Sequence, residues 1–70
     1  MEISIAIVVN GEKREAKPGA VVLDLLQSLG LNSGRVAIER NLEILPRPVW
    51  AQTAVESGDH YEIVQFVGGG

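Results

Sequence analysis

The sequence contains no cysteine, so the protein has no disulfide, no thiolate metal site and no cysteine nucleophile. Its single histidine cannot by itself supply the three or four protein ligands of a zinc site. No apolar run approaches the roughly 20 residues that cross a bilayer, and the N-terminus lacks the basic segment and long apolar core of a signal peptide. We therefore expect a soluble cytoplasmic protein that binds no metal and no membrane.

A clustered surface of one charge is also missing. The 70-residue chain carries six Lys or Arg and nine Asp or Glu, a formal net charge of −3, and the two signs are interspersed. Nucleic-acid-binding proteins usually gather Lys and Arg on one face, so nucleic acid is disfavoured as a partner. A chain of this length forms one domain that buries only roughly 60% of its unfolded surface, which leaves little room for a catalytic cavity.

The N-terminal segment has the pattern of a β-hairpin. β-Branched residues alternate along residues 3–9, which predicts a strand. Asn10-Gly11 follows, and this dipeptide is typical of a type I′ turn because both of its central positions need a positive φ. Residues 12–17 are mostly charged, so we expect them to return as an edge strand.

The hydrophobic period then changes to that of a helix. Apolar residues recur at positions i, i+3, i+4 and i+7, namely Val22, Leu25, Leu26 and Leu29. Asp24 lies in the predicted first turn, where a carboxylate complements the free backbone N–H groups. Gly30 stands where a left-handed cap ends a helix. We expect a helix of roughly two to three turns whose apolar stripe packs across a sheet.

Three further strands are predicted in the second half of the chain. Residues 36–40 form the third strand, residues 43–45 a short fourth strand and residues 60–67 the last strand. A single helical turn over residues 48–51 would let Trp50 close one end of the core.

This order of elements predicts the fold class. A hairpin, a helix and three more strands indicate an α+β roll, in which one main helix covers a mixed sheet of four to five strands. The first and last strands can lie parallel in the centre, because the helix supplies the crossover that parallel pairing needs. Asn41 is expected to take a left-handed conformation in the turn after the third strand.

No catalytic constellation is evident. Asp59 and His60 are the only acid and histidine adjacent in sequence, but neighbouring strand residues point to opposite faces. Asp59 is therefore badly placed to orient His60 for a hydrolytic triad, and we expect His60 to be a solvated strand residue. The C-terminal glycines are not followed by a helix, so they form no phosphate-binding loop. Any ATP must be held by a partner.

The most informative feature is the ending Gly68-Gly69-Gly70. Glycine has no Cβ and can lie extended in a channel too narrow for other residues, and the terminal carboxylate is a chemical handle. The alternative is a frayed end without function. Val64 and Phe66 share one face of the last strand, where they form either a docking patch or the second apolar face of a central strand. The opposite face carries Tyr61, Ile63 and Val67.

Taken together, these features resemble those of the ubiquitin-like (β-grasp) sulfur carriers, most closely the thiamin-biosynthesis sulfur carriers of the ThiS family. The resemblance covers essentially the whole chain. It rests on the Asn10-Gly11 hairpin, Asp24-Leu25-Leu26, residues 36–41, Trp50, Gly58-Asp59 and the ending 63–70. Family members often carry Thr at the position of Val21 as a helix N-cap, and its absence costs about 1 kcal/mol of stability.

The resemblance implies a carrier that is not itself an enzyme. Residues 1–67 would form the β-grasp domain and residues 68–70 the flexible tail. In this family an E1-like adenylyltransferase uses ATP to adenylate the terminal glycine, here Gly70. A persulfide source converts the adenylate to a thiocarboxylate, and the sulfur passes to thiazole synthase. Gly68 and Gly69 would lie in the tail channel, Val64 and Phe66 would dock the partner, and the chain would hold no cofactor of its own.

Three alternatives remain open at this point. The small subunit of molybdopterin synthase has the same fold, tail and activation. A ubiquitin-type modifier would form isopeptide bonds to lysines, and a general carrier would serve tRNA thiolation. A plain interaction module would have an inert tail.

Overall fold

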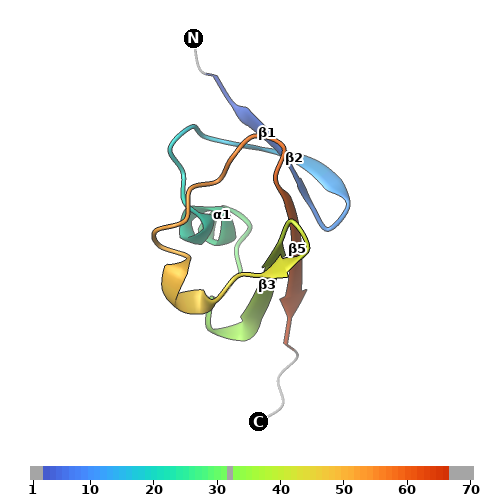
Figure 1. Ribbon diagram of the computed structural model, residues 1–70, viewed down its shortest axis with the longest axis vertical. Coiled ribbons are helices and arrows are strands. Elements are labelled where there is room, and N and C mark those ends of the chain that lie inside the picture. The colour runs from blue at the N-terminus through green and yellow to red at the C-terminus, as the bar shows by residue number, and fades with distance from the viewer. Residues whose placement is uncertain (1–2, 32, 67–70) are drawn as a thin grey trace.

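The computed structural model describes residues 3–31 and 33–66. Within them a five-stranded sheet has the order β2-β1-β5-β3-β4. The elements are β1 (Ile5–Val9), β2 (Glu12–Ala16), α1 (Val22–Ser28), η1 (Ser33–Arg35), β3 (Val36–Arg40), β4 (Glu43–Ile44), η2 (Arg47–Val49) and β5 (His60–Gln65). The helix α1 lies on one side of the sheet, and no described element covers the other side (Figure 1). The predicted α+β roll is confirmed.

Strands β1 and β5 form the parallel centre of the sheet, as predicted. Val8 and Val9 pair with His60 and Tyr61. The other neighbouring strands pair antiparallel, and β2 and β4 lie at the two edges. The outer face of the sheet is defined here as the side that does not face α1.

Several predicted boundaries are wrong by one or two residues. The first strand begins at Ile5, two residues after the predicted start, and the second ends at Ala16, one residue before the predicted end. The short strand β4 ends at Ile44, although Leu45 still donates its N–H to the carbonyl of Ile38 at 2.8 Å. The last strand ends at Gln65, while the predicted final residue, position 67, lies outside the described residues.

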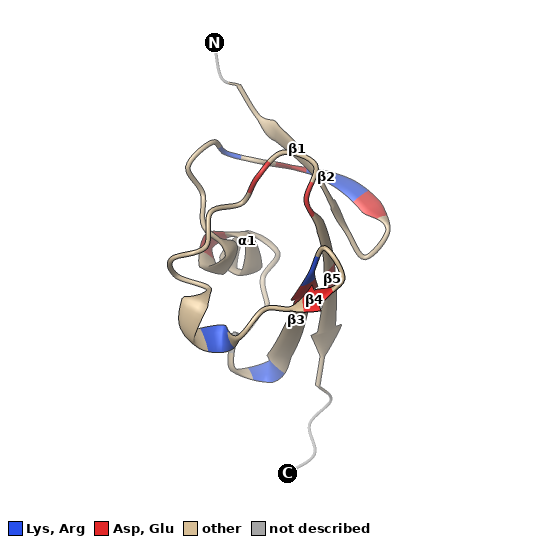
Figure 2. Cartoon of the chain, viewed as in Figure 1, with Lys and Arg blue, Asp and Glu red and all other residues tan. Residues whose placement is uncertain are grey.

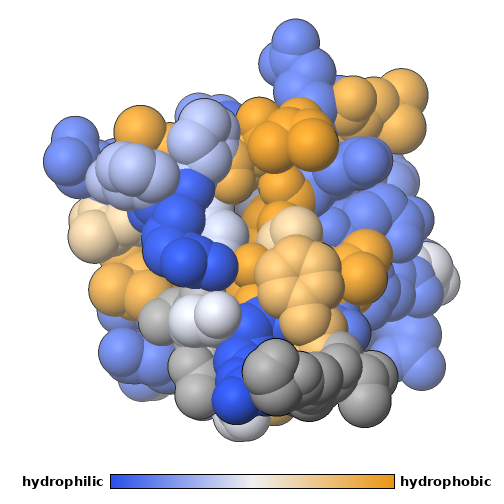
Figure 3. Space-filling view, turned by 90° about the horizontal axis from the view of Figure 1, so that it is seen from below, coloured by the Kyte–Doolittle hydropathy of each residue, from blue (hydrophilic) through white to orange (hydrophobic). Residues whose placement is uncertain are grey.

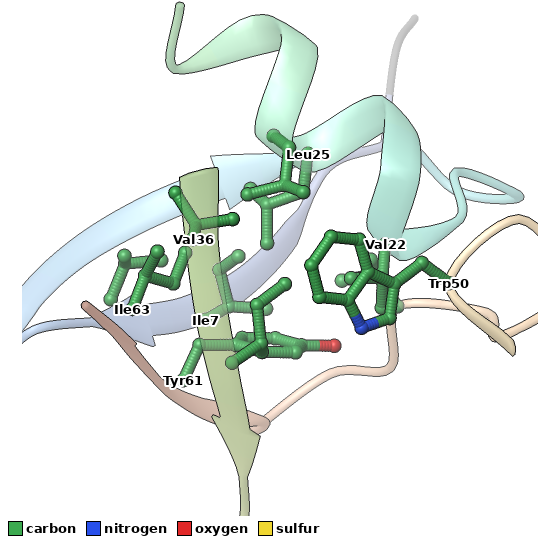
Figure 4. Packing of buried hydrophobic residues seen from close by; sticks show 11 residues of the cluster. Ile7, Val22, Leu25, Val36, Trp50, Tyr61 and Ile63 are labelled. Carbon is green, nitrogen blue, oxygen red and sulfur yellow. The ribbon is translucent and has the colours of Figure 1, made fainter. Parts of the chain in front are cut away.

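The core forms between α1 and the inner face of the sheet (Figure 4). Its buried members are Ile7, Val9, Val22, Leu25, Leu26, Val36, Ile38, Trp50, Val55, Tyr61 and Ile63. Trp50 is 3% exposed and donates its indole N–H to the carbonyl of Leu45 at 2.8 Å, so it closes one end of the core as predicted. The helical turn before it is a 3-10 turn at Arg47–Val49, slightly earlier than expected.

The ends of α1 follow the local sequence signals. Asp24 accepts a hydrogen bond from the N–H of Val21 at 3.0 Å, which is one half of a capping box. The other half is missing because a valine side chain has no acceptor. Gly30 has a φ of +73°, so the predicted left-handed cap is confirmed.

The Asn10-Gly11 turn has an additional role. Both residues have positive φ, 51° and 82°, as a type I′ turn requires. The Asn10 side chain also accepts a hydrogen bond from the N–H of Ile63 at 2.8 Å and donates one to the carbonyl of Ile63 at 3.1 Å. The β1–β5 pairing ends at Val9 and Tyr61. Beyond it, the Asn10 side-chain amide makes the two hydrogen bonds that a residue of a neighbouring strand would make, and so it holds β5 at Ile63.

Candidate functional site

Strand β5 leads to the C-terminal segment and is held by β3 as far as its end, while on its other side β1 and Asn10 hold it only as far as Ile63. Val36 pairs with Gln65 at the last position of the β3–β5 ladder. One residue later, Phe66 donates its N–H to the carbonyl of Arg35 at 2.7 Å. The predicted tail residues Gly68, Gly69 and Gly70 lie outside the described residues. The last described residue, Phe66, is thus fixed to the sheet two positions before the first of the three glycines.

The two faces of β5 divide as expected. Tyr61 and Ile63 are buried under the helix, 1% and 8% exposed. Val64 and Phe66 lie on the opposite side and are 59% and 54% exposed. The second apolar face of this central strand is therefore open and is not covered by any described part of the chain.

Two further apolar residues lie on the same face of the sheet. Val64 lies opposite Ala37 in the β3–β5 ladder, and Ile44 of β4 lies opposite Glu39. Ile44 is 73% exposed. Seen from the end of the molecule that carries the C-terminus, apolar surface occupies the middle of the view (Figure 3). The predicted docking residues Val64 and Phe66 are thus exposed near the end of β5, with Ala37 beside Val64.

A buried carboxylate anchors the opposite end of β5. Asp59 is 4% exposed. Its Oδ2 accepts hydrogen bonds from the N–H of Glu56 at 2.9 Å, Nε of Arg40 at 3.0 Å and the hydroxyl of Tyr61 at 2.8 Å. Its Oδ1 accepts one from Nδ2 of Asn41 at 3.2 Å. This network ties the start of β5 to the end of β3.

These bonds also set the protonation of the network. Burial alone would raise the pKa of Asp59, but the hydrogen bonds from Glu56, Tyr61, Asn41 and Arg40 outweigh it and lower the pKa below its ordinary value. Burial and the bond to Asp59 raise the pKa of the Tyr61 hydroxyl. Asp59 is therefore ionised and Tyr61 neutral at pH 7, which is a structural arrangement and not a proton-transfer pair.

The relation of Asp59 to His60 is as predicted. His60 is exposed and its Nδ1 lies 3.1 Å from the carbonyl of Gly58, whereas the carboxylate of Asp59 bonds to other residues. Sequence reasoning missed the Asp59 network, because Arg40 and Asn41 come from a segment 19 and 18 residues away. The only local signal was a carboxylate at the buried start of a strand.

The described surface offers no converging catalytic groups. Two open cavities of about 620 and 570 Å³ lie between β2 and α1, lined in part by Glu15, Leu25 and Ser28. Residues 3–31 and 33–66 contain no cluster of three His, Asp or Glu side chains that could hold a metal ion. No helix in the same ranges is both long and apolar enough to cross a membrane. What the described residues provide is a folded body whose last strand ends beside the exposed apolar side chains of Val64 and Phe66.

Comparison with known proteins places this geometry in a family. The family described as the ThiS family matches residues 7–70. Thiazole synthase from Paramagnetospirillum magneticum is 52% identical over 64 residues, which cover 91% of this chain and 20% of that protein. The sulfur carrier protein ThiS of Escherichia coli K12 is 33% identical, over 91% of this chain and 97% of its own length.

A solved structure agrees with both comparisons. The crystal structure of the thiamine biosynthesis protein ThiS from Geobacter metallireducens superposes with a TM-score of 0.79 at 32% identity, over 94% of this chain and all of that chain. The chain spans about a fifth of the length of the thiazole synthases that it matches. Its match to the carriers covers more than 90% of this chain and of each carrier. The ubiquitin-like β-grasp fold is confirmed, and the chain belongs to the ThiS family.

Proposed function

We propose that the protein is a sulfur carrier in thiamin biosynthesis whose reactive group is the carboxylate of Gly70. The family match extends to Gly70, and this is the observation that carries the proposal. The named function of the E. coli relative, a sulfur carrier, supports it further. The chain acts as a protein co-substrate and has no catalytic residue of its own.

The proposed chemistry takes place on the tail. An E1-like adenylyltransferase joins the Gly70 carboxylate to the α-phosphate of ATP and releases pyrophosphate. A persulfide source attacks the carbonyl carbon and displaces AMP, and a thiol then reduces the S–S bond to leave a thiocarboxylate. Adenylation replaces a poor leaving group with a good one, so that one hard step becomes two easier ones. ATP and sulfur are thus used by partners, and the chain holds no cofactor.

Thiazole synthase is the proposed acceptor of the sulfur. Two relatives that contain a region similar to this chain, from Paramagnetospirillum magneticum and Magnetococcus marinus, are thiazole synthases. This favours the thiamin pathway over a carrier for molybdopterin synthesis or tRNA thiolation. It also favours a carrier over a modifier that forms isopeptide bonds with lysines.

The exposed apolar residues would supply the docking energy. Ordering Gly68, Gly69 and Gly70 in a channel costs about 1–2 kcal/mol of backbone entropy per residue, and glycine has no side chain to offset this cost. Complete burial of one large apolar side chain contributes about 1.5–3 kcal/mol. Val64 and Phe66 are more than half exposed and lie within four residues of Gly68, so their burial against the enzyme would offset part of this cost.

The test is the intact mass of the chain after incubation with ATP, a sulfur source and an E1-like enzyme. We expect one oxygen to be replaced by sulfur, with the change localised to Gly70. Gly70→Ala should keep the circular dichroism spectrum and melting temperature but become charged far more slowly, because the channel admits only glycine. An unchanged mass with an enzyme that charges another carrier would refute the proposal, and equal charging of Gly70→Ala would refute the role of the channel.

A further inference from the structure

An exposed cation lies at the base of the tail. Arg35 ends the turn η1, and its carbonyl is held by the N–H of Phe66 at 2.7 Å. Its side chain is exposed and forms no ion pair with any acid of residues 3–31 or 33–66. The backbone of Arg35 therefore has a structural role, while its guanidinium group has none within the described protein.

The other basic residues differ from Arg35 in partner or in position. Three of the six have partners in the described part of the chain: Arg14 pairs with Glu12, Arg40 with Asp59 and Glu56, and Arg47 stacks over Trp50. Lys13 and Lys17 have no ion pair there, but they lie in and after the edge strand β2. In the view of Figure 2, basic segments and no acidic segment occupy the end from which the C-terminal trace leaves.

The register places Lys17 far from the tail. Ala16, the residue before it, pairs with Ile5 at the start of β1. Because β1 runs parallel to β5, this start lies at the end of the sheet opposite to Gln65. Within residues 3–31 and 33–66, Arg35 is thus a cation without an ion pair beside the end of β5, and Lys17 is another at the opposite end of the same sheet.

An arginine at this position is suited to carboxylates and not to the nucleotide. Its planar guanidinium binds carboxylates or phosphates through paired hydrogen bonds. The four residues after Phe66, which end at Gly70, span up to about 13–14 Å when extended. If Gly70 meets the α-phosphate of ATP at the end of such a tail, Arg35 is too far away to reach that phosphate. The group that it meets must lie at the entrance of the channel.

We propose that Arg35 is a positioning residue that docks the tail-bearing end of the carrier against carboxylate side chains of the enzyme that adenylates Gly70. This inference rests on the proposed function. The chain has a net charge of −3. An acidic surface on the enzyme therefore repels the carrier as a whole but attracts the guanidinium group of Arg35. The carrier is therefore oriented with its C-terminal tail toward the enzyme. The attraction between Arg35 and the carboxylates weakens at higher salt concentration, because salt screens it.

The experiment measures AMP or pyrophosphate formation at varied concentrations of the carrier. In about 0.05 M salt, Arg35→Glu should raise KM for the carrier about tenfold and leave kcat within about twofold. Arg35→Lys, which keeps the charge, should stay within about threefold of the unchanged protein. In about 1 M salt, where the Debye length falls to about 3 Å, the difference in KM between Arg35→Glu and the unchanged protein should disappear.

Lys17→Glu is the matched control, because it makes the same change in net charge at an exposed residue without an ion pair. It should change KM less than about twofold. If Arg35→Glu and Lys17→Glu raise KM equally, the effect of Arg35 is due only to the net charge of the carrier, and the inference is overturned. So would an Arg35→Glu variant with the KM of the unchanged protein. If Arg35→Glu lowers the melting temperature, Arg35→Gln replaces it, with an expected rise in KM of about threefold.

Failure of this inference is distinguishable from failure of the proposed function. If Gly70 is charged normally but KM does not respond to Arg35, only the docking role is wrong. If the unchanged protein is not charged by a competent enzyme, the proposed function itself fails.

Discussion

Glu39 of β3 and Glu62 of β5 lie directly opposite each other on the outer face of the sheet. Both are exposed, and neither forms an ion pair within the described residues. Like charges at opposed positions of neighbouring strands are destabilising. The outer face thus carries two neighbouring carboxylates, while Val64 and Phe66 lie closer to the end of β5.

Replacing one of these carboxylates with a cation should stabilise the isolated domain. We expect Glu39→Lys to raise the free energy of unfolding by about 0.5–1 kcal/mol, because a repulsive cross-strand pair becomes an attractive one. Urea unfolding measures the change. Combining Glu39→Lys with Glu62→Lys restores like charges and should remove the gain, which a double-mutant cycle isolates. A gain that survives in the double variant would show that the pair does not interact.

The buried carboxylate gives the stability of the fold a defined dependence on pH. The pKa of Asp59 is lower in the folded protein than its ordinary value of 3.8. Its contribution is therefore present above about pH 4 and is lost as the pH falls through the lower folded-state pKa. Asp59→Asn should cost about 2–3 kcal/mol at pH 7 and should lose less stability than the unchanged protein between pH 5 and about pH 2.

Urea unfolding at a series of pH values tests this expectation. Glu56→Gln is the control, since the Glu56 side chain is exposed and pairs with the same Arg40 at 2.8 Å. Exposed pairs contribute about 0–1 kcal/mol, so the control should follow the pH profile of the unchanged protein. Parallel profiles for Asp59→Asn and the unchanged protein would contradict the assigned role.

Removal of the Phe66 side chain should weaken binding to the adenylating enzyme with little effect on the stability of the fold. We expect Phe66→Ala to raise KM for adenylation about tenfold, because Phe66 is 54% exposed and available to a partner. The melting temperature should fall by no more than about 2 °C. Leu42→Ala is the control, since Leu42 is 91% exposed and lies in the β3–β4 turn, at the other end of β3 from the residue that pairs with Gln65. Equal rises in KM for both variants would rule out a specific docking patch.

Leu42 itself has an unfavourable backbone conformation. Its φ is +72°, directly after Asn41 at +52°, and the left-handed region costs a residue with a side chain roughly 1–2 kcal/mol. Leu42→Gly should therefore raise the free energy of unfolding by about 0.5–1 kcal/mol, once the greater chain entropy of glycine is subtracted. Chemical denaturation would decide this, and a loss of stability would mean that the leucine makes a compensating contact.

The sequence predicted those features that depend on local signals. The Asn10-Gly11 turn, the apolar stripe of α1 and the left-handed Gly30 each follow from a few neighbouring residues, and the structure confirms them. The parallel pairing of β1 and β5 was also predicted, because a helix between two strands allows few other connections.

The missed features depend on contacts between distant segments. Nothing near Asn10 indicates that its amide would bond to Ile63, 53 residues later. The left-handed Leu42 follows from the short turn between β3 and β4, where the pairing of Arg40 with Glu43 leaves only two residues to reverse the chain. The geometry of a two-residue turn thus forces a positive φ on Leu42, although leucine prefers a negative φ.

The parallel pairing of β1 and β5 has a practical consequence for handling the protein. The start of β1 and the end of β5 lie at opposite ends of the sheet. An affinity tag or a surface linkage attached ahead of Ile5 therefore stands a full sheet length away from Phe66. Immobilisation through that side leaves the end of β5 that carries Phe66 facing the solution.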